Sequence, residues 1–188
     1  MASMPKTRMK RVATMKDLHK VEGKAELVDG RIVRIMPTGS RPGRVSRNIL
    51  LSLCAYEQAT RSGTAYPDNV AFMAHLPHRG SFSPDVSFYT GPQPADPDEF
   101  LPEPPDFAVE VRSKGDYGRA GEKRLRAKRA DYFAAGTTVV WDVHPMNRTV
   151  TVYRAADPDR PTVYKSGQIA EAEPAVPGWR MAVSDVFA

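Results

Sequence analysis

Residues 105–143 read PDFAVEVRSKGDYGRAGEKRLRAKRADYFAAGTTVVWDV, an apolar strand, a helix and a second apolar strand in succession. In the first strand, residues 107–111, side chains alternate between two faces, so Phe107 lies on one face and Glu110 on the other. Burying an ionised carboxylate in mid-strand costs free energy unless a cation or a hydrogen-bond donor meets it. Glu110 therefore either needs such a partner or faces solvent on a half-exposed antiparallel strand.

The helix that follows is predicted from Tyr117 to about Ala135, with Gly136 at its C-terminal cap. Alternating steps of four and three residues place one set of side chains on a shared face: Gly121, Leu125, Lys128, Tyr132 and Ala135. A lysine on such a stripe either runs its methylenes along the core and its ammonium to water, or directs the ammonium toward carboxylates at the edge of the sheet. A second acid nearby would favour the latter arrangement.

That second acid is Asp85. Residues 80–89 predict one strand, in which the large apolar side chains Phe82, Val86 and Phe88 alternate with a face that carries Asp85. Pro84 has no N–H group, which indicates an edge position or a bulge just before Asp85. If the strands that carry Asp85 and Glu110 are neighbours, their carboxylates converge.

The order Pro-Asp, then Glu after a loop, then Lys resembles the PD-(D/E)XK nuclease superfamily, and more closely its restriction-endonuclease-like group often called the Uma-two family. The resemblance covers nearly the whole chain from about Lys16. Its matching segments are Glu26–Val33, Ser83–Ser87, Pro105–Ser113, Lys128–Tyr132 with Gly136, Val140–Val143, Val150–Tyr153, and Pro177–Trp179 leading to Val186–Phe187. The resemblance implies an α/β (α+β) fold, with a restriction-endonuclease-like core in which helices flank a central mixed β-sheet, and with extra β-hairpins.

The resemblance also implies a metal-dependent site. Asp85 and Glu110 are expected to hold one or two Mg²⁺ ions, or Mn²⁺, with the carbonyl of Val111 as a further ligand. Lys128 would orient or deprotonate the attacking water, or neutralise the attacked phosphate. Glu26 either adds a carboxylate near the site or is an exposed strand residue.

Two positions depart from the family pattern. Arg112 stands where the compact E-X-K motif has its lysine; an arginine cannot act as a base at neutral pH, but it can clamp phosphate. Residues 38–44 contain no histidine, although family members tend to carry one before the first long helix. These departures leave open a catalytically inactive nucleic-acid-binding or interaction module on the same fold.

Composition narrows the class of protein. The chain has 188 residues, 41% of them hydrophobic, which suits one domain at residues 16–188 after a flexible basic tail at residues 1–15. The single cysteine, Cys54, excludes an internal disulfide and a cysteine cluster for zinc or iron–sulfur binding. No run approaches the ~20 apolar residues that span a bilayer, and no secretory signal is present. We expect a cytoplasmic protein with no membrane partner.

Other segments predict the remaining elements. Asp29-Gly30 predicts a hairpin at residues 25–36, and residues 16–22 a short helical turn. A long helix is expected from Pro42 to about Ser62, closed by Gly63, followed by a strand at residues 65–73. His75 and His78 fit a surface loop better than a metal site. Residues 91–105 are too rich in proline for regular structure, whereas strands are expected at residues 137–143 and 149–154. Short strands near residues 161–164 and 179–183, with Val186-Phe187, complete the sheet or a surface for the expected homodimer.

The formal net charge of +5 is compatible with a polyanionic partner, and we expect that partner to be DNA. The residues predicted to contact its phosphates are Arg44, Arg47, Arg112, Lys123 and Arg124, with Arg126 and Arg129 on the same helix as the last two. These features together predict a Mg²⁺- or Mn²⁺-dependent endonuclease that hydrolyses DNA phosphodiester bonds. The inactive module is the alternative, and a structural dimer whose acids are surface groups is a third.

Overall fold

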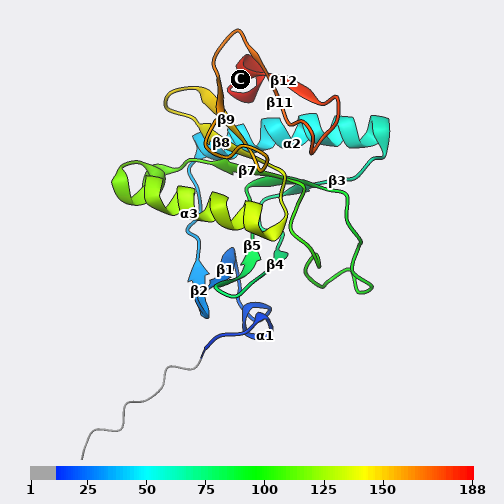
Figure 1. Ribbon diagram of the computed structural model, residues 1–188, viewed down its shortest axis with the longest axis vertical. Coiled ribbons are helices and arrows are strands. Elements are labelled where there is room, and N and C mark those ends of the chain that lie inside the picture. The colour runs from blue at the N-terminus through cyan, green and yellow to red at the C-terminus, as the bar shows by residue number, and fades with distance from the viewer. Residues whose placement is uncertain (1–11) are drawn as a thin grey trace, which may run out of the picture.

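The computed structural model describes residues 12–188, and its centre is a six-stranded mixed sheet (Figure 1). The strand order is β10-β9-β8-β7-β6-β3. The strands are β3 (Thr64–Pro67), β6 (Val86–Tyr89), β7 (Phe107–Val111), β8 (Val139–His144), β9 (Thr149–Arg154) and β10 (Thr162–Tyr164). Only β7 and β8 pair in parallel within this sheet, because α3 (Arg119–Ala135) connects them as a crossover helix. The strand-helix-strand unit predicted at residues 105–143 is confirmed.

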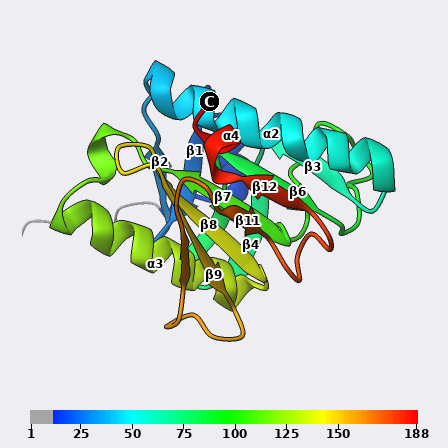
Figure 2. The same ribbon diagram turned by 90° about the horizontal axis from the view of Figure 1, so that it is seen from above.

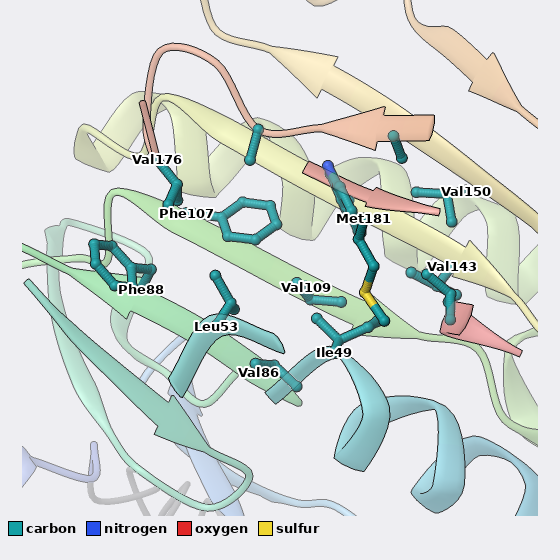
Figure 3. Close-up of a cluster of buried hydrophobic side chains, with 14 of the residues drawn as sticks. Ile49, Leu53, Val86, Phe88, Phe107, Val109, Val143, Val150, Val176 and Met181 are labelled. Carbon is teal, nitrogen blue, oxygen red and sulfur yellow. The ribbon is translucent and has the colours of Figure 1, made fainter. Parts of the chain in front are cut away.

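Two helices cover opposite faces of this sheet (Figures 1 and 2). Helix α2 (Ser40–Thr60) packs on the face that carries Phe107 and Val109, whereas α3 lies over the face that carries Ala108. Figure 3 shows Ile49 and Leu53 of α2 directed at the sheet, where both side chains are fully buried. Burying one such side chain contributes about 1.5–3 kcal/mol. The alternation read from residues 107–111 therefore divides the core into two layers.

The C-terminal segment closes the core on the α2 side. It contains β11 (Ile169–Glu171), paired antiparallel with β12 (Arg180–Ala182), and the short helix α4 (Val183–Val186). Met181 of β12 reaches into the cluster in Figure 3. Of the two alternatives predicted for the short C-terminal strands, residues 162–164 do extend the main sheet, as β10. Residues 180–182 instead form a separate hairpin with β11, and Val186 ends α4.

A second, four-stranded sheet is ordered β2-β1-β5-β4 and lies next to α3 on the side away from α2 (Figure 1). Its strands are β1 (Ala25–Val28), β2 (Arg31–Arg34), β4 (Phe72–Leu76) and β5 (Arg79–Phe82). The predicted hairpin is confirmed, because β1 and β2 pair antiparallel. Asp29 and Gly30 connect them with positive φ, at 48° and 63°, as a two-residue type I′ turn requires. The helical turn predicted at residues 16–22 is α1 (Met15–Leu18).

Two predicted strands are each divided. Residues 80–89 are not one strand but β5 and β6, which belong to different sheets, and the break at residues 83–85 contains Pro84. Residues 65–73 are likewise β3 and β4, separated by a turn in which Asn69 has φ 68°. In both places the chain passes from one sheet to the other, which alternation in the sequence cannot show.

Both long helices begin two residues away from their predicted starts, α2 at Ser40 and not Pro42, and α3 at Arg119 and not Tyr117, and one C-terminal end differs as well. Gly136, at φ 122°, caps α3 as expected, whereas α2 ends at Arg61 in the left-handed conformation and not at Gly63. Gly63 is needed for space, because a Cβ there would lie 2.6 Å from the ring of Phe88. The 3₁₀ turn η1 (Lys114–Asp116) precedes α3, and residues 91–105 are mainly irregular, with buried Leu101 against β4.

Of the tail predicted at residues 1–15, residues 1–11 lie outside the described part of the chain. The N–H of Ala13 donates to the carbonyl of Gly30 at 2.8 Å, and Met15 begins α1. Within residues 12–188 the structure contains no helix with the length and hydropathy that crossing a bilayer requires.

Candidate active site

Glu110 lies in mid-β7, on the face of the sheet that α3 covers, and its side chain is 15% exposed. Its Oε1 accepts hydrogen bonds from the ammonium of Lys128 and the hydroxyl of Tyr132, both at 2.7 Å. Burial raises the pKa of the Glu110 carboxyl, and the charges of Asp85 and Glu26 raise it further, although two lysines oppose them. The solvent-facing alternative for Glu110 is therefore wrong.

Asp85 is held beside Glu110 by the pairing of β6 with β7. The register places Val86 opposite Val109, so Asp85 and Glu110 are the next residues along the two antiparallel strands. The N–H of Asp85 donates to the carbonyl of Val109 at 3.0 Å, and Asp85 Oδ2 accepts from the N–H of Val111 at 2.7 Å. Backbone hydrogen bonds thus fix the position of the first acid relative to the strand of the second.

Lys128 connects two of the carboxylates. Its Nζ lies 2.7 Å from Glu110 Oε1 and 2.8 Å from Glu26 Oε1, and its side chain is 12% exposed, so it does not extend to water. Burial by itself would lower the pKa of Lys128, but Glu110 and Glu26 together raise it above the usual value. Lys128 is therefore a protonated ammonium between two acids at neutral pH.

Glu26 is buried, so the alternative of an exposed strand residue is wrong. Besides Lys128, it accepts hydrogen bonds from Arg79 Nη1 at 2.8 Å and from the N–H of Ser83 at 2.9 Å. Burial would raise the pKa of Glu26, but Lys128 and Arg79 hold it below the usual value. Because both oxygens of Glu26 already have donors, this carboxylate positions Lys128 and Arg79.

Two basic residues of this cluster were missed by the sequence reasoning. Arg79 donates to Glu26 and also, through Nε, to Asp131 at 2.6 Å. Lys24 places its Nζ 2.7 Å from Asp85 Oδ1 and 2.6 Å from Asp68 Oδ1. A weak signal for Lys24 existed, because it precedes Glu26 by two residues and an extended chain places such residues on one face. No local pattern singled out Arg79.

The two histidines lie at the surface as predicted, but only His78 is in a turn, whereas His75 belongs to strand β4. His75 and His78 are both exposed, and their Nε2 atoms contact different groups, the carbonyl of Pro102 at 2.6 Å and Asp131 at 2.8 Å. The two side chains therefore do not converge on one point.

The carboxylates of Asp85 and Glu110 fit a Mg²⁺ site in which the protein supplies only two side-chain ligands. Within residues 12–188, no group of three or more His, Cys, Asp or Glu side chains is arranged to hold a metal. Mg²⁺ is commonly held by only one or two carboxylates, with waters and substrate phosphates completing its six ligands. Asp85 and Glu110 match that pattern, and Asp85 opens onto a cavity of about 200 Å³ that Asp68, Val111 and Arg47 also line.

The residues predicted to bind DNA occupy three places. Arg44 and Arg112 line a cleft of about 1220 Å³, which we call the basic cleft because Arg41, Lys114 and Arg148 line it as well. The guanidinium of Arg112 is paired with Asp142, at 2.6 Å and 2.8 Å, and with Glu122.

The remaining predicted DNA contacts lie outside the basic cleft. Arg47 lines the smaller cavity beside Asp85. Lys123 and Arg124 are exposed on α3, and Arg124 bonds Asp116 at 2.8 Å; neither residue lines the basic cleft or the smaller cavity.

Comparison with known proteins gives two similarities. The profile of the family described as "Uma2: Putative restriction endonuclease" matches residues 13–184. A crystal structure described as "a putative nuclease belonging to DUF820", from Anabaena variabilis ATCC 29413, is 18% identical in sequence, with 93% of this chain and 97% of that chain covered and a TM-score of 0.72. This likeness shows the same fold. No curated protein is significantly similar to the chain.

Proposed function

Because this chain belongs to the Uma2 family of restriction-endonuclease-like proteins, we propose that it is a metal-dependent endonuclease that hydrolyses phosphodiester bonds in DNA, with residues 16–188 as one nuclease domain. The observation that carries the proposal is the position of Lys128. Its ammonium lies 2.7 Å from Glu110 on β7 and 2.8 Å from Glu26 on β1, so two acids from separate segments enclose it. Glu110 in turn lies opposite Asp85, the residue that follows Pro84.

Asp85 and Glu110, with the carbonyl of Val111, would hold Mg²⁺, for which Mn²⁺ can substitute. When bound, the ion supplies an activated water and stabilises negative charge on the attacked phosphate. Glu110 must lose its proton to act as a ligand, which its neighbours Lys128 and Lys24 favour. The backbone of β7 orients Asp85 through the N–H of Val111.

Lys128 acts as a cation in this mechanism. A general base must be unprotonated near the working pH, and the two glutamates that surround Lys128 raise its pKa instead. A fixed ammonium in a largely water-excluded site stabilises charge that develops on a phosphate oxygen. Glu26 is a positioning residue, because it holds Lys128 on one side and Arg79 on the other.

The basic cleft is the proposed path of the DNA backbone. None of its lining residues within the described chain has an acidic side chain, whereas five are arginine or lysine. It adjoins the cavity at Asp85, since Pro42 lines both and Arg112 of the cleft follows Val111 of the cavity. Contacts between cations and phosphates give salt-dependent affinity with little sequence preference. Lys123 and Arg124 on α3, and Arg47 beside Asp85, would add further phosphate contacts.

One observation favours the inactive nucleic-acid-binding module as a second candidate. Arg112 stands where the E-X-K motif has a catalytic lysine, and its guanidinium is paired with Asp142 and Glu122. That module would bind DNA through the basic cleft with no need for a divalent ion.

Cleavage assays separate the two candidates. Supercoiled, linear and single-stranded DNA are incubated with Mn²⁺ or Mg²⁺ and with wild type, Glu110→Gln, or the control Glu103→Gln, which changes an exposed loop glutamate. We expect wild type and the control to cut at least one substrate, and Glu110→Gln to lose activity by about 100-fold or more. If the DNA stays intact in every reaction, and the affinity of the protein for DNA is the same with and without divalent metal, the inactive module is favoured. We also expect a cytoplasmic homodimer, which fractionation and gel filtration test.

A further inference from the structure

Lys24 lies where a bound cation would be expected. Its ammonium is 2.7 Å from Asp85 Oδ1 and 2.6 Å from Asp68 Oδ1, and its side chain is 13% exposed. Asp85 is one of the two carboxylates that the proposed function assigns to the divalent ion. An ammonium and a divalent ion would therefore compete for the same carboxylate.

The charges in the cluster show why this matters. Glu26, Asp85 and Glu110 supply three negative charges, and three positive charges interact with them, on Lys24, Lys128 and Arg79. Lys128 is enclosed by Glu26 and Glu110, while Lys24 neutralises Asp85. With Lys24 in place, little net negative charge is left to attract a divalent cation, and like charges at such short range repel strongly.

Lys24 also has a second carboxylate partner, Asp68, to which it can remain bound. Asp68 lies after β3, at the turn that leads to β4, and its side chain is 50% exposed, compared with 22% for Asp85. Both carboxylates line the cavity of about 200 Å³. A lysine has a flexible four-carbon side chain with a compact charge, so Lys24 can leave Asp85 and keep its ion pair with Asp68.

We propose that Lys24 is a resident cation of this site, which bridges Asp85 and Asp68 while no divalent ion is bound, and which releases Asp85 but keeps Asp68 when an ion binds. Lys24 thereby determines the concentration of divalent ion that the protein needs. The inference rests on the proposed metal-dependent function and deepens it by naming the residue that competes with the metal.

Mn²⁺ binding to the full chain without DNA tests this directly, by calorimetry and by the electron paramagnetic resonance signal of free Mn²⁺. Lys24→Gln is expected to bind Mn²⁺ at least tenfold more tightly than wild type. The matched control is Lys20→Gln, an exposed lysine four residues earlier, which is expected to leave the affinity unchanged. Circular dichroism and thermal unfolding verify that each variant is folded.

Asp68→Asn provides a second, independent readout. Without Asp68 as an alternative partner, Lys24 remains on Asp85, so Mn²⁺ binding weakens. Part of that weakening comes from the removed charge of Asp68 itself. Comparing the double variant Lys24→Gln/Asp68→Asn with Lys24→Gln measures that part alone. We expect the weakening caused by Asp68→Asn to be at least threefold larger when Lys24 is present.

The possible failures are distinguishable. If Glu110→Gln abolishes Mn²⁺ binding but Lys24→Gln leaves it unchanged or weaker, or if Asp68→Asn has the same effect in both backgrounds, the role of Lys24 is refuted while the metal site stands. If no variant, including Lys24→Gln, binds Mn²⁺ in a manner that depends on Glu110, the proposed function falls and the role of Lys24 falls with it.

Discussion

Replacing Lys128 by methionine tests whether the cluster depends on its central cation. The ammonium lies 2.7 Å and 2.8 Å from Glu110 and Glu26, whose side chains are only 15% and 6% exposed. Removing one partner of a buried ion pair leaves an uncompensated charge and costs about 3–5 kcal/mol. Since Arg79 still neutralises Glu26, most of this cost falls on Glu110.

The cost should depend on pH with a definite sign. Glu110 already has a raised pKa, and losing Lys128, the largest opposing charge, raises it more. In the folded variant Glu110 stays protonated, whereas in the unfolded chain it ionises above its ordinary pKa of about 4.3. Between that pH and the folded-state pKa, the variant therefore loses about 1.4 kcal/mol of stability per pH unit. The deficit relative to wild type is therefore larger at pH 8 than at pH 5.

Urea unfolding of wild type and Lys128→Met at both pH values measures these differences. For a domain of this size, a loss of 3–5 kcal/mol at pH 8 corresponds to a melting temperature lower by roughly 6–20 °C. Lys123→Met, an exposed lysine on the same helix, is the control and should change stability by less than about 0.5 kcal/mol. Adding Glu110→Gln to Lys128→Met should recover part of the loss. A Lys128→Met deficit under about 1 kcal/mol, or one independent of pH, would refute the reasoning.

Three further predictions concern neighbouring groups. Arg112→Gln removes the closer cation of the buried Asp142 and leaves Arg129, 3.6 Å away, so it should cost about 1.5–3 kcal/mol in urea unfolding; a cost below about 1 kcal/mol would contradict the pairing described above. Glu26 has a lowered pKa, so the stability that it supplies is present above its ordinary pKa and is lost as the pH falls through the lowered value; Glu26→Gln should therefore flatten the acid unfolding curve, and an unchanged curve would contradict this. The double variant Arg44→Gln/Lys114→Gln should depend less on salt when it binds duplex DNA, as measured by fluorescence anisotropy without metal. The slope of log affinity against log salt concentration should fall in magnitude by about 0.9 for each phosphate that the variant no longer neutralises. An unchanged slope would show that the DNA does not follow the basic cleft.

Local patterns predicted the parts of this fold that local physics controls. The alternation of residues 107–111 correctly divides β7 between two core layers, because successive side chains of a strand point to opposite faces. Gly136 ends α3 and Asp29-Gly30 forms the hairpin turn, because these positions have positive φ, which most residues other than glycine adopt only at a cost in free energy. The helical stripe through Lys128 and Tyr132 correctly faces the sheet.

The amino-acid sequence by itself determined this set of elements. It also identified the charged residues whose burial costs free energy unless they are paired, Asp85, Glu110 and Lys128. Tertiary structure alone decided their partners. It divided residues 80–89 between two sheets, brought Lys24 to Asp85 across 61 residues, and buried Arg79 against Glu26. The physical reason is that a charge is accommodated by whichever opposite charge lies within a few ångströms, and distance in space is set by how sheets and helices pack and not by spacing along the chain.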